Sequence, residues 1–156
     1  MPAVYWEGRA YQLKGEDSET VLDVLLRNGV AVSYACKSGT CGSCMLRAES
    51  GVVPARAQAG LKDSWKMQGY FLACVCQPAA DLTVTTVGAE ARIGARIASL
   101  NDLSATVKQV RLHCDVPFDF HAGQYITIIR EDGLARSYSV ASLPEEGAGQ
   151  GAIELH

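Results

Sequence analysis

Three cysteines fall within nine residues of the sequence, in the segment Cys36-Lys-Ser-Gly-Thr-Cys41-Gly-Ser-Cys44. A fourth, Cys74, follows further along, so that the full spacing is Cys-x4-Cys-x2-Cys-x29-Cys. Cysteine sulfur is a soft ligand for metals and also forms disulfides. The spacing therefore indicates a site held by cysteine sulfur, and three kinds of site can use it.

Disulfides, zinc and an iron–sulfur cluster are the three alternatives. Disulfides are disfavoured because the first three thiols lie very close together and the N-terminus shows no signal peptide, which indicates a reducing, cytoplasmic location. Zinc ligands usually come as two short Cys-x2-Cys pairs or include histidines, whereas here the first gap is four residues and His113, His121 and His156 lie far downstream. The spacing matches that of a [2Fe–2S] cluster. We predict that Cys36, Cys41, Cys44 and Cys74 are its metal ligands.

The residues between the ligands suit a tight loop around an anionic group. Gly39 and Gly42 allow close backbone approach and positive φ angles. Ser38, Thr40 and Ser43 are small, and their hydroxyls can add hydrogen-bond donors.

Two further cysteines have simpler interpretations. Cys76 competes with Cys74 as the fourth ligand, but two residues apart on a strand point to opposite faces, so only one of them can reach the loop. We expect Cys74 to be the ligand, and Cys76 and Cys114 to be small buried side chains.

The cysteine loop is expected to follow a strand pair and one amphipathic helix. Residues 4–13 are predicted to form strands with a turn at Gly8 and Arg9. A helix is predicted over residues 18–28, with Asp17 or Ser18 as its N-cap and Gly29 just beyond its end.

The rest of the chain is predicted to be rich in β-strands. The expected strands are residues 81–87, 91–100, 105–114, 125–130, 136–141 and 152–155. A turn is expected at Asn101 and Asp102. We divide the chain into a first domain over residues 1–88, a linker over 89–96 and a second domain over 97–156.

A second set of residues, on the expected strand at 136–141, has types suited to a nucleotide cofactor. Arg136 is a fixed cation suited to phosphate, Tyr138 can stack on a planar ring, and Ser139 can donate to a ring nitrogen. Alternation along a strand places Ser137 and Ser139 on the face opposite Arg136 and Tyr138. Taken alone, an exposed Arg and Tyr on a strand are more often ordinary surface.

Residues 1–88 resemble a plant-type ferredoxin domain, through the cysteine loop and the segment Leu72-Ala-Cys74. The resemblance implies an α+β, β-grasp fold and one-electron transfer. Residues 97–156 resemble the start of the FAD-binding β-barrel of the ferredoxin–NADP⁺ reductase superfamily, through Gly123-Gln124-Tyr125 and Arg136-Ser137-Tyr138-Ser139. This second resemblance implies that Arg136 meets the flavin pyrophosphate, that Tyr138 lies against the isoalloxazine, and that Ser137 and Ser139 belong to the same cofactor site.

The order of the two domains is similar to that in NADH-dependent reductase components of bacterial multicomponent oxygenases. That similarity implies an oxidoreductase part that passes electrons from FAD through the cluster to an oxygenase or another redox protein. The remaining barrel and the nicotinamide-binding domain of that family have no counterpart in this sequence, so we expect an incomplete antiparallel barrel, weakened or lost FAD binding, and use of NAD(P)H only through a missing domain. The alternative is a stand-alone [2Fe–2S] electron carrier with a non-functional flavin-domain remnant. We assign no catalytic residue.

The composition narrows the range of partners. The net charge of −3 is too small to indicate a nucleic-acid partner, and the 48% hydrophobic content is ordinary for a globular protein. No stretch of about 18 apolar residues is present, so no membrane partner is expected.

Overall fold

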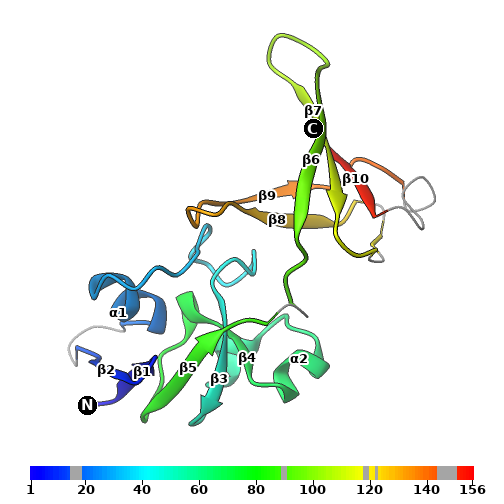
Figure 1. Ribbon diagram of the computed structural model, residues 1–156. Helices are drawn as coiled ribbons and strands as arrows, with labels where there is room; N and C mark the ends of the chain where they lie inside the picture. Colours follow the sequence, from blue (N-terminus) through cyan, green and yellow to red (C-terminus); the bar gives the residue numbers. More distant parts are fainter. Residues whose placement is uncertain (15–18, 89–90, 118–119, 122, 144–150) are drawn as a thin grey trace. The chain divides into compact units, whose positions relative to one another are not determined.

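The computed structural model of the protein describes residues 1–14, 19–88, 91–117, 120–121, 123–143 and 151–156 (Figure 1). The chain divides into two compact units, Met1–Val87 with Ile129–Ala135 and Gly88–Ile128 with Arg136–His156. Among the residues described, no helix is long and apolar enough to cross a membrane.

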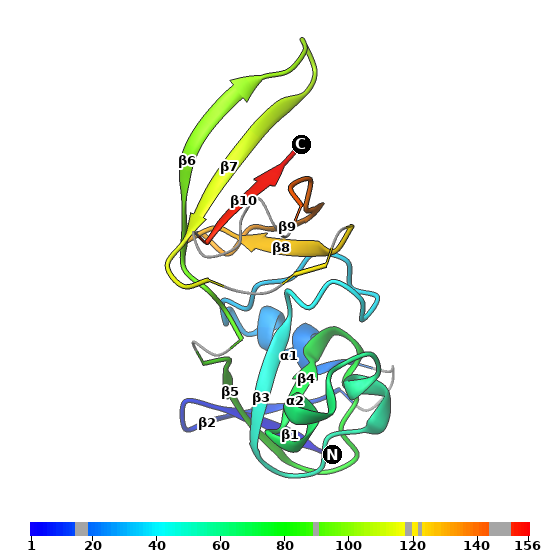
Figure 2. The same cartoon turned by 90° about the vertical axis from the view of Figure 1, so that its right-hand side faces the viewer.

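The first unit is built on a five-stranded mixed sheet. Its strands are β1 (Ala3–Trp6), β2 (Arg9–Gln12), β3 (Met45–Ser50), β4 (Tyr70–Leu72) and β5 (Leu82–Thr86). The spatial order is β2-β1-β5-β3-β4, and β1 and β5 pair in parallel while the other neighbours are antiparallel (Figure 2). The strand that comes last in this domain therefore lies at the centre of its sheet.

The α-helix α1 (Val21–Arg27) packs its apolar face against β1, β2 and the 3₁₀ helix η2 (Ala73–Val75). Its N-cap is Thr20, whose hydroxyl accepts from the Asp23 amide while the Asp23 carboxylate accepts from the Thr20 amide, a complete capping box. The predicted helix over 18–28 thus begins later than expected, and Asp17 and Ser18 lie outside the described residues. The helix ends as expected at Asn28 and Gly29, where Gly29 adopts a φ of 77°.

Side chains from the helix and from both halves of the sheet make up the core of this unit. The largest fully buried ones are Tyr70, Phe71, Leu22, Leu25, Leu82, Val4, Val21, Val24 and Val84. A second 3₁₀ helix, η1 (Ala55–Gln58), and the helix α2 (Asp63–Met67) lie between β3 and β4. The Gln58 amide donates to the Tyr70 and Lys66 carbonyls, which ties this connection to β4 and α2.

The second unit contains five described strands in two antiparallel sheets. They are β6 (Ala95–Asp102), β7 (Lys108–Cys114), β8 (Tyr125–Ile129), β9 (Ala135–Ser139) and β10 (Ala152–Leu155). One sheet has the order β10-β7-β6, and β8 pairs with β9 in the other. A bridge between Val140 and Leu155 joins the two sheets. The described strands do not close into a barrel.

The ends of the first strand in this unit differ in detail from what the sequence indicates. Asn101 and Asp102 belong to β6 and pair with Gln109 and Lys108, so the turn falls after them, where Leu103 donates to Val107. The expected linker over 89–96 overlaps β6, because Ala95 already pairs with the end of β7. In both places a strand continues as long as a partner strand supplies hydrogen bonds, which local composition does not reveal.

The core of the second unit is small. It consists of Leu112, Cys114, Phe120, Val140, Ile153 and Leu155, with Val110, Ile126 and Ile128 packed against it. Nearly every residue of β6 is exposed, including Ile97 and Leu100. This unit therefore leaves more apolar surface open than the first.

Candidate metal centre

The cysteine loop joins the segment after α1 to the start of β3. Lys37, Gly39 and Gly42 all adopt positive φ angles, of 53°, 78° and 74°. These left-handed residues coil the backbone tightly between the first and third cysteines. The loop ends where the Met45 amide donates to the Gly42 carbonyl over 3.1 Å, and the chain enters β3.

Strand pairing places Cys74 next to this loop. Met45 pairs with Leu72 across β3 and β4, and the Ala73 amide donates to the Cys44 carbonyl over 3.2 Å. Cys74 itself lies in η2, not in a strand. The argument that Cys74 and Cys76 point to opposite faces of a strand was therefore wrong in its premise, since the chain turns at η2 after β4 ends.

The four thiols lie close enough to perturb one another. The hydrogen bond with Cys74 is the largest cause that raises the pKa of Cys44, followed by burial. The same hydrogen bond lowers the pKa of Cys74 to about 7, against the effect of burial. The charge of Cys36 also acts on Cys74, and that of Cys41 acts on Cys44. Cys44 and Cys74 thus interact directly. Cys41 lies near Cys44, and Cys36 lies near Cys74.

Hydrogen bonds from the loop converge on the first thiol. The Ser38 amide lies 3.3 Å from Cys36 Sγ, and the Thr40 hydroxyl donates to the same sulfur over 3.4 Å. Burial acts to raise the pKa of Cys36, but hydrogen bonds from the side chains and amides of Ser38 and Thr40 outweigh it and lower the pKa to about 5. The loop therefore stabilises a negatively charged sulfur at this position.

The site is buried at one end and open at the other. Cys44 and Cys74 are only 3% and 8% exposed, whereas Cys36 is exposed and Cys41 is intermediate. Ser43 is fully buried, and its Oγ lies 3.0 Å from Cys41 Sγ. The site therefore opens to solvent on the Cys36 side.

Cys76 and Cys114 differ from these four cysteines because burial is the main influence on their thiols. Cys76 is fully buried, and burial alone raises its pKa to about 12. Its carbonyl accepts from the Val21 amide over 2.8 Å, which fixes the start of α1. Burial likewise raises the pKa of Cys114, helped by the charge of Asp115. The simple interpretation of both as small buried side chains agrees with their burial.

Sequence reasoning missed two contacts of the loop. Gly39 faces Val75 so closely that a Cβ atom at Gly39 would lie 3.2 Å from both methyl groups of Val75. Lys37 Nζ lies 4.8 Å from the centre of the Tyr34 ring, within the range of a cation–π interaction. Val75 directly follows Cys74, but nothing in the local sequence shows that it packs on a glycine more than thirty residues earlier.

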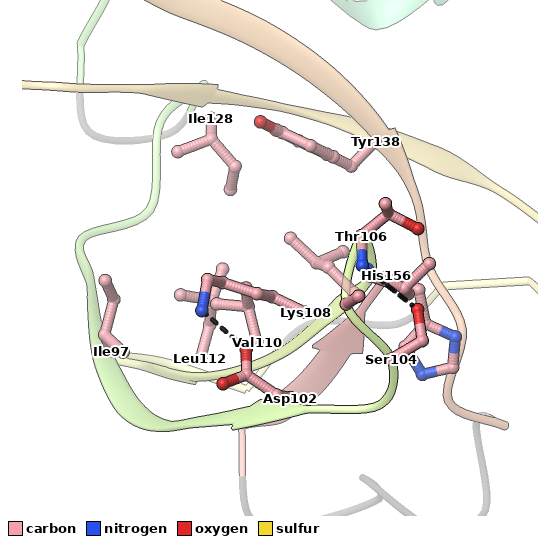
Figure 3. Close-up of a pocket in the computed structure, with 13 residues that line it drawn as sticks. Ile97, Asp102, Ser104, Thr106, Lys108, Val110, Leu112, Ile128, Tyr138 and His156 are labelled. Carbon is pink, nitrogen blue, oxygen red and sulfur yellow. Dashed lines mark hydrogen bonds and ion pairs between the residues drawn. The ribbon is translucent and has the colours of Figure 1, made fainter.

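The second predicted set lies on β9, after the five-stranded sheet in the chain. Arg136, Ser137, Tyr138 and Ser139 are all exposed. The Ser137 and Thr127 hydroxyls lie 3.0 Å apart across β8 and β9. Tyr138 and Ile128 face a cavity of about 480 Å³, and Val110 and Leu112 of β7 form its opposite wall (Figure 3).

Four cysteine thiolates are what a [2Fe–2S] cluster requires, and this chain brings four thiols together with hydrogen bonds already directed at sulfur. Within the described ranges, no three His, Cys, Asp or Glu side chains are placed to hold a single ion. The mixed sheet, its packed helix and the cysteine loop define a ferredoxin-type electron-transfer domain. Residues 4–79 match the family described as 2Fe-2S iron-sulfur cluster binding domain.

Nearly the whole chain is also homologous to reductase components of bacterial oxygenases. It is 34% identical over 153 residues to the phenol hydroxylase P5 protein of Acinetobacter pittii, covering 90% of this chain and 42% of that protein. It is 35% identical over 137 residues to the reductase component of the naphthalene 1,2-dioxygenase system of Pseudomonas putida, covering 81% and 40%. A crystal structure of the Amycolatopsis cytochrome P450 reductase GcoB has 28% identity and a TM-score of 0.49, covering 99% of this chain and 48% of that one. The chain thus spans less than half the length of these relatives.

Proposed function

We propose that this chain carries single electrons through a [2Fe–2S] cluster held by Cys36, Cys41, Cys44 and Cys74, as the ferredoxin and flavin part of an NAD(P)H-dependent oxygenase reductase. The observation that carries the proposal is the convergence of the four thiols between the loop and η2. When bound, the cluster supplies a one-electron redox couple.

The protein's own residues would perform three tasks at this site. The loop donates hydrogen bonds to sulfur, which favours the charged form of the ligands. The buried thiols Cys44 and Cys74 exclude water from one end. The rim of the loop, residues 37–43, is our proposed docking surface for the electron acceptor, because Lys37, Ser38 and Thr40 are exposed there beside the exposed Cys36.

Two matched variants test the ligand assignment. Cys74→Ala should abolish the visible absorption of the cluster and leave iron and sulfide below one equivalent per chain. Cys76→Ala removes the same atoms from a buried thiol that we do not assign as a ligand, and should keep the cluster while lowering thermal stability. Loss of the cluster in the Cys76 variant with retention in the Cys74 variant would reverse the assignment. Zinc without iron or sulfide in the unmodified protein would refute the proposal.

The flavin part of the proposal depends on Arg136, Ser137, Tyr138 and Ser139. Their exposure on β9 leaves them accessible to a cofactor, with Tyr138 as the aromatic plate. Addition of this protein to FAD should quench flavin fluorescence, and Tyr138→Ala should weaken that quenching. Tyr11→Ala removes a partly exposed tyrosine from β2, in the other unit, and serves as the control. Absence of any quenching by the unmodified chain would favour the alternative function, a stand-alone electron carrier.

The acceptor that we propose is an oxygenase component or another metalloprotein. The support is that the named relatives belong to phenol hydroxylase and naphthalene dioxygenase systems. Reduced protein, prepared with dithionite and freed from excess reductant, should lose its electrons to a matching oxygenase faster than to a protein without a redox centre. Equal rates would refute a specific acceptor.

A further inference from the structure

Ser43 lies in the cysteine loop between two of the predicted ligands, and its side chain is buried. Among the described residues, it is the one buried serine, threonine, amide or charged residue, with 1% of its surface exposed. Its Oγ lies 3.0 Å from Cys41 Sγ, a hydrogen-bonding distance for sulfur. A buried hydroxyl without a partner destabilises a fold. The contact with Cys41 therefore explains how this hydroxyl can lie away from water.

The direction of this hydrogen bond depends on the state of the cysteine. While Cys41 is a free thiol, either atom can carry the proton. A cysteine binds metal as the thiolate, which has lost its proton. The serine hydroxyl carries one O–H donor. When Cys41 binds iron, Ser43 is therefore the donor and Cys41 Sγ the acceptor.

Backbone hydrogen bonds on both sides hold Ser43 in place. The Met45 amide donates to the Gly42 carbonyl over 3.1 Å, which closes the turn around Ser43. The Ala73 amide donates to the Cys44 carbonyl over 3.2 Å, which ties the next residue to η2. The position of the hydroxyl is therefore set by the fold of the loop and does not depend on its own hydrogen bond alone.

We propose that Ser43 is a positioning residue that donates its buried O–H to Cys41 Sγ and so raises the reduction potential of the cluster. This inference rests on the proposed function, because it requires that Cys41 is a ligand. Reduction adds one electron to the cluster and its thiolates, and a donated hydrogen bond stabilises the more negative state more strongly. Loss of the donor therefore lowers the reduction potential.

Burial distinguishes Ser43 from the other hydroxyl that donates to a ligand sulfur. Thr40 Oγ1 donates to Cys36 Sγ over 3.4 Å, and both of these residues are exposed. Water can take the place of an exposed donor with little loss. At Ser43 the surroundings exclude water, and a hydrogen bond in such surroundings is electrostatically stronger. The buried hydroxyl should therefore affect the potential more than the exposed one.

Anaerobic redox titration followed by the visible absorption of the cluster measures this difference. At one fixed solution potential, Ser43→Ala should lower the ratio of reduced to oxidised cluster about three- to tenfold, and tenfold corresponds to about 59 mV for a one-electron couple. Thr40→Val should lower the ratio less than about twofold, because water replaces the lost donor. Ser43→Thr keeps a hydroxyl and should stay within about twofold of the unmodified protein.

Ser50→Ala is the control for the loss of a serine hydroxyl elsewhere in the same domain. The hydroxyls of Ser50 and Thr83 lie 2.9 Å apart, at the end of β3 remote from the cysteine loop. This variant breaks a hydroxyl pair without touching the predicted ligands. It should leave the reduction potential unchanged.

The outcomes separate a role in the potential from a purely structural role. A change below about twofold in Ser43→Ala would overturn the inference even if thermal stability falls, because a structural role leaves the potential unchanged. Equal shifts in Ser43→Ala and Thr40→Val would overturn the effect of burial. Failure of Ser43→Ala to assemble a cluster would mean that the hydroxyl is required for assembly, and would overturn its assignment as a residue that sets the potential.

Two further results have a defined meaning. If the added methyl group of Ser43→Thr prevents assembly of the cluster, the comparison of Ser43→Ala with Thr40→Val decides the question alone. An unmodified protein without iron and sulfide would refute the proposed function itself. A protein that holds the cluster but whose potential does not respond to Ser43→Ala would refute this inference and leave the proposed function standing.

Discussion

Gly39 and Gly42 provide a matched pair of sites for an added methyl group in the cysteine loop. Both have positive φ angles, of 78° and 74°. Alanine at either position pays the cost of the left-handed conformation, about 1–2 kcal/mol. A Cβ at Gly42 would have no atom within 4 Å, whereas at Gly39 it would lie 3.2 Å from two methyl carbons of Val75.

The contact with Val75 decides the difference between the two variants. Carbon atoms pack best at about 3.5–4.0 Å, so Val75 or the loop must move. Crowding of this kind costs about 1–3 kcal/mol. The Gly39 backbone also helps to lower the pKa of Cys74, and displacement of the loop would weaken that effect. We therefore expect about 1–2 kcal/mol for Gly42→Ala and about 2–5 kcal/mol for Gly39→Ala.

Thermal loss of the visible cluster absorption, at one fixed scan rate, measures this difference. In a domain of about 60–100 residues, 1 kcal/mol shifts the midpoint by about 4–8 °C. Gly39→Ala should therefore lower the midpoint by at least about 4 °C more than Gly42→Ala. In a Val75→Ala background, the added cost of Gly39→Ala should fall to that of Gly42→Ala. Equal midpoints for the two glycine variants, or no relief from Val75→Ala, would refute the reasoning.

Three further predictions concern the stability of the ferredoxin-type domain. Thr20→Ala removes the capping hydroxyl of α1 and should cost about 1 kcal/mol in denaturant unfolding, and an unchanged midpoint would contradict the cap. Phe71→Ala empties a fully buried position on β4 and should cost about 3–5 kcal/mol in the same assay, whereas a cost below 1 kcal/mol would mean that the site collapses or is not buried. A hydrogen bond from Arg27 lowers the pKa of Glu19, so its stabilisation is present above the ordinary value of 4.5 and is lost as pH falls through the lowered pKa. Glu19→Gln should make the free energy of unfolding depend less on pH in this acid range. An identical pH profile would show that the ion pair of Glu19 with Arg27 contributes nothing to stability.

The sequence carries a clearer signal for the cysteine site than for which strands pair with one another. The cysteine spacing alone is specific because the gaps of four and two match one kind of cluster. The structure brings Cys36, Cys41, Cys44 and Cys74 together, and their role as ligands stays a prediction. The reason given for Cys74 over Cys76 was not the right one, however, because the turn at η2 depends on how β4 ends and not on alternation along a strand.

Features that depend on tertiary contacts could not be predicted from the spacing or types of neighbouring residues. The N-cap of α1 is Thr20, and an acidic segment just before it offered competing caps of similar propensity. The end of β6 at Asp102 depends on pairing with Lys108, while the residue types favour a turn. The contact of Gly39 with Val75 joins two segments that only the fold brings together.

The central position of β5 has a consequence for the order of events during synthesis. β5 pairs with β1 on one side and with β3 on the other, so it joins the β2-β1 pair to the β3-β4 pair. All four predicted ligands precede β5 in the chain, and they leave the ribosome before the sheet that supports them can be completed. Contacts between the first and last strands of a domain also form slowly. We therefore expect the thiols to be exposed to oxidants on the nascent chain, and stable insertion of the cluster to wait until residue 86 has been made.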